Sequence, residues 1–307
     1  MAIPAAANAE PIRLGLEFWL GYGPLWVAER EAYFEKHGVD VELVIIPMDD
    51  DMRNALQNGD IDVAASPTNG LILEVTRGVS QRGFLVLDTS LEADAIIANP
   101  EITDIADLRG KTIAYETGTT SDLLLGYALK THGMSLADVV PVPMPASEAG
   151  AALAVGNVEA AVTYEPYIAP VLAENSAAKV IYTAAKKPGL ISDLLTAKPA
   201  WIAAHHGDVQ GLIRAWDDAV EFIREHPGEG LEIIASAVDS PVDEIKPAFA
   251  GLRLYTAEEN VAFVDGTFQA TISDIGEMMQ TIHPEEIEFV PSADELLSLN
   301  DLRAVAR

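Results

Sequence analysis

Small hydroxyl side chains follow one predicted strand at the point where a helix begins. Thr117, Thr119 and Thr120 lie between the short apolar stretch 111–115 and the apolar run 123–129. A strand that leads through such a turn into a helix leaves backbone N–H groups unpaired at the helix start, where they can hold a polar or anionic ligand group. The alternative is an ordinary connection in which a threonine or serine only caps the helix.

Acidic and aromatic side chains follow the first predicted strand. Glu17 lies near the end of the alternating stretch 12–18, and Trp19 and Tyr22 lie in the turn after it. An aromatic face in such a turn can stack on a flat ligand or hold a cation. We therefore predict that Glu17, Trp19 and Tyr22 contact a ligand, with core packing as the alternative for Trp19.

Two further strand ends carry candidate ligand-binding residues. Ser66 and Thr68 follow the predicted strand 61–65 and supply hydroxyl donors, and Tyr164 and Glu165 follow a second strand of the same kind. Glu165 can pair with a cation or cap the helix that follows it. We predict that all four residues contact a ligand.

The candidate segments contain acids but no bases. The segments are 18–24, 66–69, 117–122 and 164–167. Neither Lys nor Arg occurs in these four segments, whereas Glu17 and Glu116 flank two of them and Glu165 lies in another. An anion receptor would usually present a guanidinium fork, although helix starts can replace it. The sequence therefore favours a cation or a neutral nitrogen compound as the ligand, with Glu165, Glu17 and Asp193 as candidate partners.

Composition limits the class of protein. The chain of 307 residues has 19 basic and 48 acidic residues and a formal charge of −29, which argues against binding nucleic acid. There is no cysteine, so disulfides and thiolate chemistry are excluded. No motif of a nucleophile elbow, phosphate loop or zinc protease occurs, and the pair His205-His206 lacks a partner at ligand spacing. We predict no catalytic residues, no cofactor and no metal.

An internal repeat organises the chain. Residues 56–65 and 153–162 each read as a helix end, a glycine, an acidic turn and a buried strand. Each copy follows a strand–turn–helix by a similar interval, which indicates two lobes built on one plan. Because ligands of open parallel sheets bind beyond the carboxyl ends of the strands, we expect the four segments to meet at one cleft.

The predicted fold is α/β, with two lobes that are each a mostly parallel sheet flanked by helices. Two pairs of apolar strands, around residues 84–98 and 181–197, predict two hinge strands that join the lobes. We assign residues 11–91 plus 194–307 to lobe 1 and residues 92–193 to lobe 2. Residues 1–10 contain a small-residue cleavage pattern and are interpreted as the remnant of a trimmed export signal, or as a disordered end.

Several of these segments resemble the substrate-binding proteins of ABC importers, in the group that binds nitrate, sulfonates, taurine and thiamine precursors. The matching segments are 34–40, 56–65, 93–98, 105–111, 153–166 and 187–195. The resemblance covers roughly residues 12–227. It implies a periplasmic-binding-protein fold of type II that closes on a small solute and delivers it to a membrane permease. It also implies that Asp94 and Asp193 are framework features of the group, which favours a structural role for each.

Within that group, residues 115–125 most resemble importers associated with urea-carboxylase pathways, for which guanidine is a plausible cargo. The resemblance thus implies an exported, periplasmic and monomeric receptor for a guanidine-like cation. Taurine or alkyl sulfonates, and thiamine-precursor pyrimidines, are alternatives on the same fold. A related pyrimidine-synthesising enzyme uses a histidine on this fold, and none of the six histidines here lies in a candidate segment.

Overall fold

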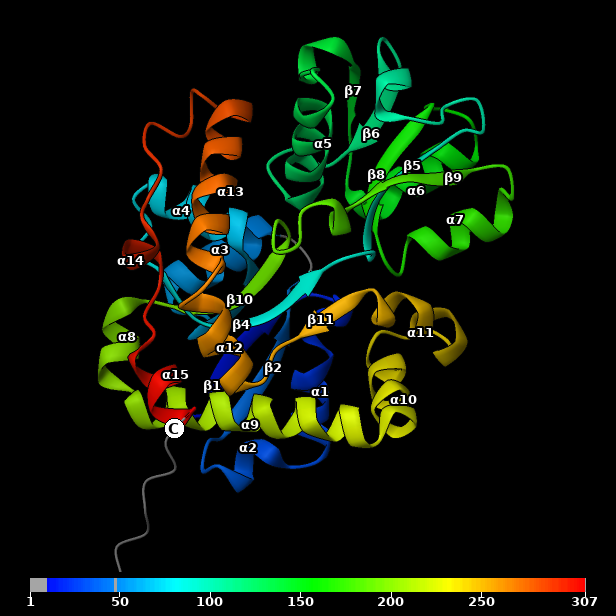
Figure 1. Ribbon diagram of the computed structural model, residues 1–307. Helices are drawn as coiled ribbons and strands as arrows, with labels where there is room; N and C mark the ends of the chain where they lie inside the picture. The colour runs from blue at the N-terminus through cyan, green and yellow to red at the C-terminus, as the bar shows by residue number, and fades with distance from the viewer. Residues whose placement is uncertain (1–9, 47–48, 307) are drawn as a thin grey trace, which may run out of the picture.

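The computed structural model describes residues 10–46 and 49–306, so the predicted signal remnant lies outside the described residues except for its last position. The chain forms two separate sheets with helices around them (Figure 1). The first sheet has the order β11-β4-β10-β3-β1-β2 and the second has the order β7-β6-β8-β5-β9. None of the helices in the described part is long and apolar enough to cross a membrane.

The strands of the first sheet come from both ends of the chain. They are β1 (Ile12–Leu16), β2 (Val41–Ile45), β3 (Val63–Pro67), β4 (Arg82–Ser90), β10 (Ser192–Ala197) and β11 (Leu252–Leu254). The strands of the second sheet are consecutive along the chain, with helices between them. They are β5 (Asp94–Ala98), β6 (Thr112–Tyr115), β7 (Val140–Pro143), β8 (Ala160–Tyr164) and β9 (Lys179–Thr183).

Both sheets are mixed, so the prediction of mostly parallel sheets is wrong in this respect. In the first sheet β1 pairs in parallel with β2 and β3, but β10 runs antiparallel to β3 and β4, and β11 runs antiparallel to β4. In the second sheet β5 runs antiparallel to both of its neighbours. β5 and β10 are each the first strand after the chain passes from one sheet to the other. Each enters its new sheet at the edge where its neighbouring strands end, and it therefore runs antiparallel to them.

The chain passes between the sheets twice, through residues 91–93 and residues 184–191. The second passage contains a short 3-10 turn, η4 (Ala184–Lys186). Each passage joins a strand of one sheet to a strand of the other, and both passages are short. The assignment of 11–91 plus 194–307 and of 92–193 to separate lobes stays a prediction.

The helices before the second passage flank the two sheets. They are α1 (Gly23–Arg30), α2 (Tyr33–Lys36), α3 (Asp49–Asn58), α4 (Thr68–Thr76), α5 (Thr120–Thr131), α6 (Ala146–Ala154) and α7 (Ile168–Glu174). Short 3-10 turns are η1 (Leu20–Tyr22), η2 (Ile105–Leu108) and η3 (Leu136–Asp138). The first helix after β1 is divided in two, because Ala32 adopts a left-handed conformation with φ 57°.

The chain after β10 is largely helical and packs mostly on the first sheet. Its helices are α8 (Pro199–Ala204), α9 (His206–Glu225), α10 (Pro227–Ala237), α11 (Val242–Ala250), α12 (Ala257–Val264), α13 (Phe268–Ile282), α14 (Ala293–Leu296) and α15 (Asn300–Val305). Helix α13 packs against both α4 and α5, and therefore touches helices of both sheets (Figure 1). Gly126 of α5 permits this approach, since a Cβ there would lie 2.4 Å from Ile282 Cδ1.

A buried asparagine covers part of the outer side of β4. Asn260, in α12, is fully buried; its Oδ1 accepts a hydrogen bond from the Val86 N–H at 3.1 Å, and its Nδ2 donates to the Val86 carbonyl. Strand β11 pairs with β4 only at Asp88 to Ser90, so it does not reach Val86. The side-chain amide therefore continues the edge pairing where the neighbouring strand is absent.

We expect Asn260→Ala to lower the free energy of unfolding by about 2–4 kcal/mol, because it leaves a buried amide and a buried carbonyl unpaired. Chemical denaturation monitored by circular dichroism measures the change. Asn54→Ala, at an exposed position in α3, is the control and should change stability by less than about 0.5 kcal/mol. Equal midpoints for the two variants would contradict this role.

Candidate functional site

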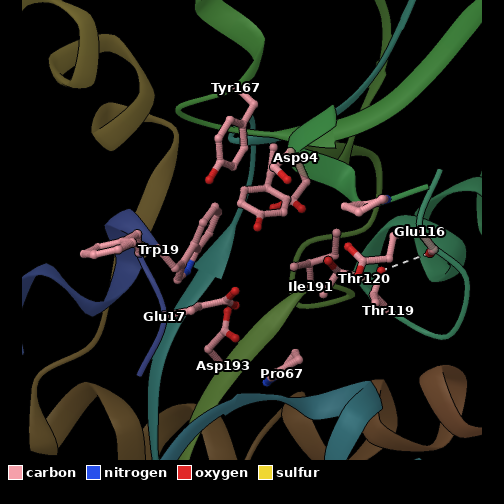
Figure 2. Close-up of a pocket in the computed structure, with 14 residues that line it drawn as sticks. Glu17, Trp19, Pro67, Asp94, Glu116, Thr119, Thr120, Tyr167, Ile191 and Asp193 are labelled. Atoms are coloured by element: carbon pink, nitrogen blue, oxygen red, sulfur yellow. Dashed lines mark hydrogen bonds between the residues drawn. The ribbon is translucent and has the colours of Figure 1, made fainter. Parts of the chain in front are cut away.

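A cavity of about 200 Å³ lies between the ends of the two sheets and is lined by residues of all four predicted segments (Figure 2). Its walls come from the residues after β1, the end of β3, the starts of β5 and β10, and the turns after β6, β7 and β8. The four segments therefore meet at one cleft, as predicted. The cavity residues fall into acids, aromatic rings and small polar or apolar side chains.

Four carboxyl side chains line this cavity, namely Glu17, Asp94, Glu116 and Asp193. Asp94 and Asp193 are nearly buried, with 4% and 5% of their surfaces exposed. Glu17 and Asp193 reach the same part of the cavity, and Asp94 lies across from them beside Tyr167 (Figure 2). Neither Lys nor Arg is among the described residues that line the cavity.

Three aromatic rings form another wall. The ring centroids of Trp19 and Tyr164 are 5.6 Å apart at an interplanar angle of 83°, and those of Tyr164 and Tyr167 are 5.4 Å apart at 72°. Edge-to-face contacts of this kind are favourable and fix the orientation of each ring. Since Trp19 follows a strand of the first sheet and Tyr164 ends a strand of the second, their contact spans the cleft.

Hydrogen bonds from behind the wall hold two of the cavity residues. Trp19 Nε1 donates to Asp88 Oδ2 at 3.1 Å, and the Tyr22 hydroxyl donates to Asp193 Oδ1 at 2.9 Å. Asp88 and Tyr22 are both fully buried. The indole and the Asp193 carboxylate therefore have fixed positions before any ligand arrives.

The buried acids carry an electrostatic cost. Burial raises the pKa of Asp94 to about 7, despite a hydrogen bond with Ser90. Burial, and then the negative charge of Asp193, raise the pKa of Asp88 well above its usual range, although the hydrogen bond from Trp19 opposes this. Among the described residues, Asp94 Oδ2 has no hydrogen-bond partner. A positive charge in the cavity would relieve this cost.

Six of the predicted site residues line the cavity: Glu17, Trp19, Thr119, Thr120, Tyr164 and Asp193. Trp19 is also part of the apolar core, so the two readings of this residue are not exclusive. Thr119 is the N-cap of α5, and its hydroxyl accepts from the Ser121 N–H at 3.3 Å and donates to the Glu116 carbonyl at 3.0 Å. Its side chain thus shapes the turn at the cavity wall.

Glu165 is not where the prediction requires it. It does not line the cavity; its Oε2 accepts a hydrogen bond from the Ala169 N–H at 3.1 Å in the first turn of α7. Burial raises the pKa of Glu165, and the backbone donors oppose that shift. Strand β8 ends at Tyr164, and the carboxylate of Glu165 points to the start of α7, so the structure places it outside this cavity in a helix-capping position.

Four other predicted residues also lie outside this cavity. Tyr22 is buried behind the wall, where it holds Asp193. Thr68 is buried too, and its hydroxyl donates to the Ser192 carbonyl at 2.9 Å. Ser66 and Thr117 line a second cavity of about 260 Å³ next to the first. These residues follow the right strands, but their side chains point to other surfaces.

Several cavity residues were not among the predicted ligand-binding set. They are Phe18, Pro67, Asp94, Glu116, Pro145, Ser147, Tyr167 and Ile191. The resemblance implies a structural role for Asp94, yet this residue, the first of β5, lines the cavity. Pro145 and Ser147 follow β7, a short strand that the sequence analysis did not identify. Its pattern of alternating valine and proline, 140–143, was the available signal.

The carboxylate of Glu116 occupies the start of a helix at the cavity edge. Its Oε2 accepts a hydrogen bond from the Ala146 N–H at 3.0 Å, the first residue of α6. Ala146 lies between the cavity residues Pro145 and Ser147. A negative protein group thus fills a place that could otherwise attract an anion.

No group of three or more histidine, aspartate or glutamate side chains in the described chain is arranged to hold a metal ion. His205 stacks on Trp201 and pairs with Asp208 at 2.8 Å, while His206 pairs with Asp301 at 2.8 Å. These contacts give both histidines structural surroundings away from the cavity.

The chain is similar to several proteins whose names describe binding proteins. It is 24% identical to a protein of Brucella abortus (strain 2308) that is named as a candidate binding protein, over 91% of this chain and 88% of the relative. The crystal structure of the periplasmic aliphatic sulphonate binding protein SsuA from Escherichia coli matches with a TM-score of 0.80 and 18% identity, over 95% of this chain and 92% of that one. The desulfurization enzyme DSZB shares the fold with a TM-score of 0.69 and 14% identity, over 97% of this chain and 99% of its own.

These likenesses confirm the predicted α/β fold with two sheets flanked by helices, which is the periplasmic-binding-protein fold. The sequence pattern of the family described as "NMT1/THI5 like" matches residues 20–230, more than half of the chain. The chain therefore belongs to the NMT1/THI5-like family.

Proposed function

We propose that this protein is a solute receptor of an ABC importer that binds a small, planar, nitrogen-rich cation of the guanidinium type. The observation that carries the proposal is the cavity lining: four carboxyl groups and four aromatic residues, with neither Lys nor Arg among the described residues that line it. The names of its relatives support the receptor role, and the charge of the cavity supports the class of ligand.

A cationic ligand would compensate the negative charge of the buried carboxylates. Removing carboxylates from water is costly unless a positive charge or several donors accompany them. Asp94 and Asp193 are nearly buried in a cavity whose other charged walls are also acidic. A guanidinium ion offers N–H donors in one plane, which suit carboxylate oxygens at its edge and aromatic rings at its faces. Glu17 and Asp193 are the proposed primary partners, and Asp94 is a third.

Alkyl sulfonates are the competing anionic ligand. The name of the Escherichia coli relative favours them, and the start of α5 at Thr119 and Thr120 offers backbone donors beside the cavity. Glu116 counts against them, because its carboxylate already occupies the start of α6. Thiamine-precursor pyrimidines are the neutral competitor, which Trp19 and Tyr164 could stack; the name of a Haemophilus influenzae relative, which assigns that protein to thiamine biosynthesis, supports this alternative.

The proposal includes the remaining features of a receptor. The protein acts outside the cytoplasm after export, as a monomer with two lobes that close around the solute by bending at residues 91–93 and 184–191. It passes the solute unchanged to a membrane permease. An enzyme of the DSZB kind is the alternative from another class, and conversion of the bound compound would distinguish it.

A thermal-shift screen tests the class of ligand. The compounds are guanidine, methylguanidine, urea, taurine, ethanesulfonate and hydroxymethylpyrimidine, each with recovery and mass analysis after incubation. We expect guanidine and methylguanidine to raise the melting temperature, because a ligand that binds only the folded state stabilises it. A shift with the sulfonates and none with guanidine would refute the cation proposal. Chemical conversion of a compound would refute the receptor role.

The charge of Asp193 should control the affinity for the cation. We expect Asp193→Asn to weaken guanidinium binding by about 2–4 kcal/mol, the scale of a buried charge-assisted interaction, while the Tyr22 hydroxyl can still donate to the amide oxygen. Isothermal titration calorimetry measures the change. Glu148→Gln removes an exposed acid in the first turn of α6 and is the control. An equal effect of both variants would mean that only overall charge matters.

Binding should also depend on pH. Because the pKa of Asp94 is about 7 without ligand, part of the protein has this group protonated near neutrality. A cation favours the charged carboxylate, so binding releases a proton below this pKa, and affinity rises with pH until the group is ionised. Glu17, Glu116, Asp193, Tyr164 and Tyr167 line the same cavity and face the same charge.

We expect the dissociation constant for guanidinium to fall by up to about tenfold per pH unit below this pKa and to level off above it. Asp94→Asn should bind more weakly and show a flatter profile between about pH 5.5 and pH 8. Calorimetry in buffers of different ionisation enthalpy measures both the affinity and the protons released. An unchanged profile in the variant would show that Asp94 does not face the ligand.

A further inference from the structure

The second cavity adjoins the first. Pro67, Glu116 and Thr119 line both cavities, so the cavities adjoin at these three residues. The second cavity, about 260 Å³ in volume, extends from there between α3, α4 and the turn after β6 to the residues after α13. A solute longer than guanidinium could place its head in the first cavity and its tail in the second.

The two cavities differ in charge. The first cavity is lined by four acids, and neither Lys nor Arg is among the described residues that line it. The second is lined by Arg53, Arg77 and His283 together with the acids Glu74, Glu116 and Glu286. The charge therefore changes from strongly negative to nearly balanced along the line that joins the cavities. A solute with a positive head and a negative tail matches this gradient.

Arg77 is the residue best suited to receive a negative tail. It is the C-cap of α4 and pairs with Glu286 through one guanidinium nitrogen. Both side chains of this pair are about four-tenths exposed, and ion pairs of such exposure contribute little to stability. A carboxylate could therefore replace Glu286, and the planar guanidinium can hold it through two parallel hydrogen bonds.

His283 lies beside the same ion pair, since its Nδ1 is 3.7 Å from Glu286 Oε1. Its Nε2 lies 2.6 Å from Asp122 Oδ2, and Asp122 is fully buried in the first turn of α5. The hydrogen bond to Asp122 raises the pKa of His283, while burial of the ring opposes this. Because Asp122 is fully buried and its Oδ2 pairs with His283, this acid does not present a free carboxylate to the cavity.

We infer that the solute is an ω-guanidino carboxylic acid, with the guanidinium in the first cavity and the carboxylate beside Arg77 in the second. The inference rests on the proposed function, since it takes the cationic head as given. It adds a second subsite and a reason for the length and the opposite charge of the tail.

Calorimetry with a series of probes tests the inference. The probes are guanidine, guanidinoacetate, guanidinopropionate, guanidinobutyrate and agmatine, whose tail carries an amine in place of the carboxylate. We expect one guanidino acid to bind at least about tenfold more tightly than both guanidine and agmatine, which is the scale of one added charge-assisted pair. The methylene number of that acid reports the distance between the subsites.

Two variants make the test specific. Arg77→Gln should remove most of the preference for the guanidino acid and leave the affinity for guanidine unchanged. Arg30→Gln, at an exposed position at the end of α1, should change neither. Tighter binding of agmatine, or an equal loss for guanidine and the acid in Arg77→Gln, would overturn the second subsite but not the cationic head. Absence of binding by every guanidino compound would overturn both.

Discussion

Buried negative charge, in a cavity whose described lining residues include neither Lys nor Arg, is the constraint on which this cleft depends. Asp88, Asp94 and Asp193 lie next to the two passages between the sheets and are almost removed from water. Their charged forms are costly there, and this cost is visible in the raised pKa values of Asp88 and Asp94. The fold tolerates them because Trp19 and Tyr22 donate to two of the three and the sheets fix their backbones.

The sequence predicted the general plan of the cleft because that plan follows from local patterns. The repeat of helix end, glycine, acidic turn and strand at 56–65 and 153–162 corresponds to α3–β3 and α6–β8 in the two sheets. Pro67 at the end of β3 and Tyr167 after β8, which follow the two copies, both line the cavity. The antiparallel placement of β5 and β10 was missed, because it depends on where the chain enters each sheet and leaves no mark in hydrophobic periodicity.

Side-chain direction was the part that the sequence could not supply. Glu116 and Glu165 each follow the last residue of a strand, and each carboxylate accepts a hydrogen bond from a backbone N–H at the start of a helix. Glu116 does so at the cavity wall, since α6 starts there, whereas Glu165 turns away toward α7. The difference arises from the position of the next helix, which is a tertiary property. Residue type alone therefore does not reveal which of these two carboxylates lines the cavity.

The shared fold and the ligand are separate questions for this family. An identity of 18% to a sulphonate-binding structure is enough to carry the two sheets and the cleft, because these depend on apolar patterning that many sequences satisfy. The ligand depends on a few charges at the strand ends. Here a carboxylate of the chain fills the helix start at Ala146, and four acids line the cavity. A helix start that attracts anions in isolation thus becomes part of an acidic wall, because the Glu116 carboxylate already accepts from its first N–H group.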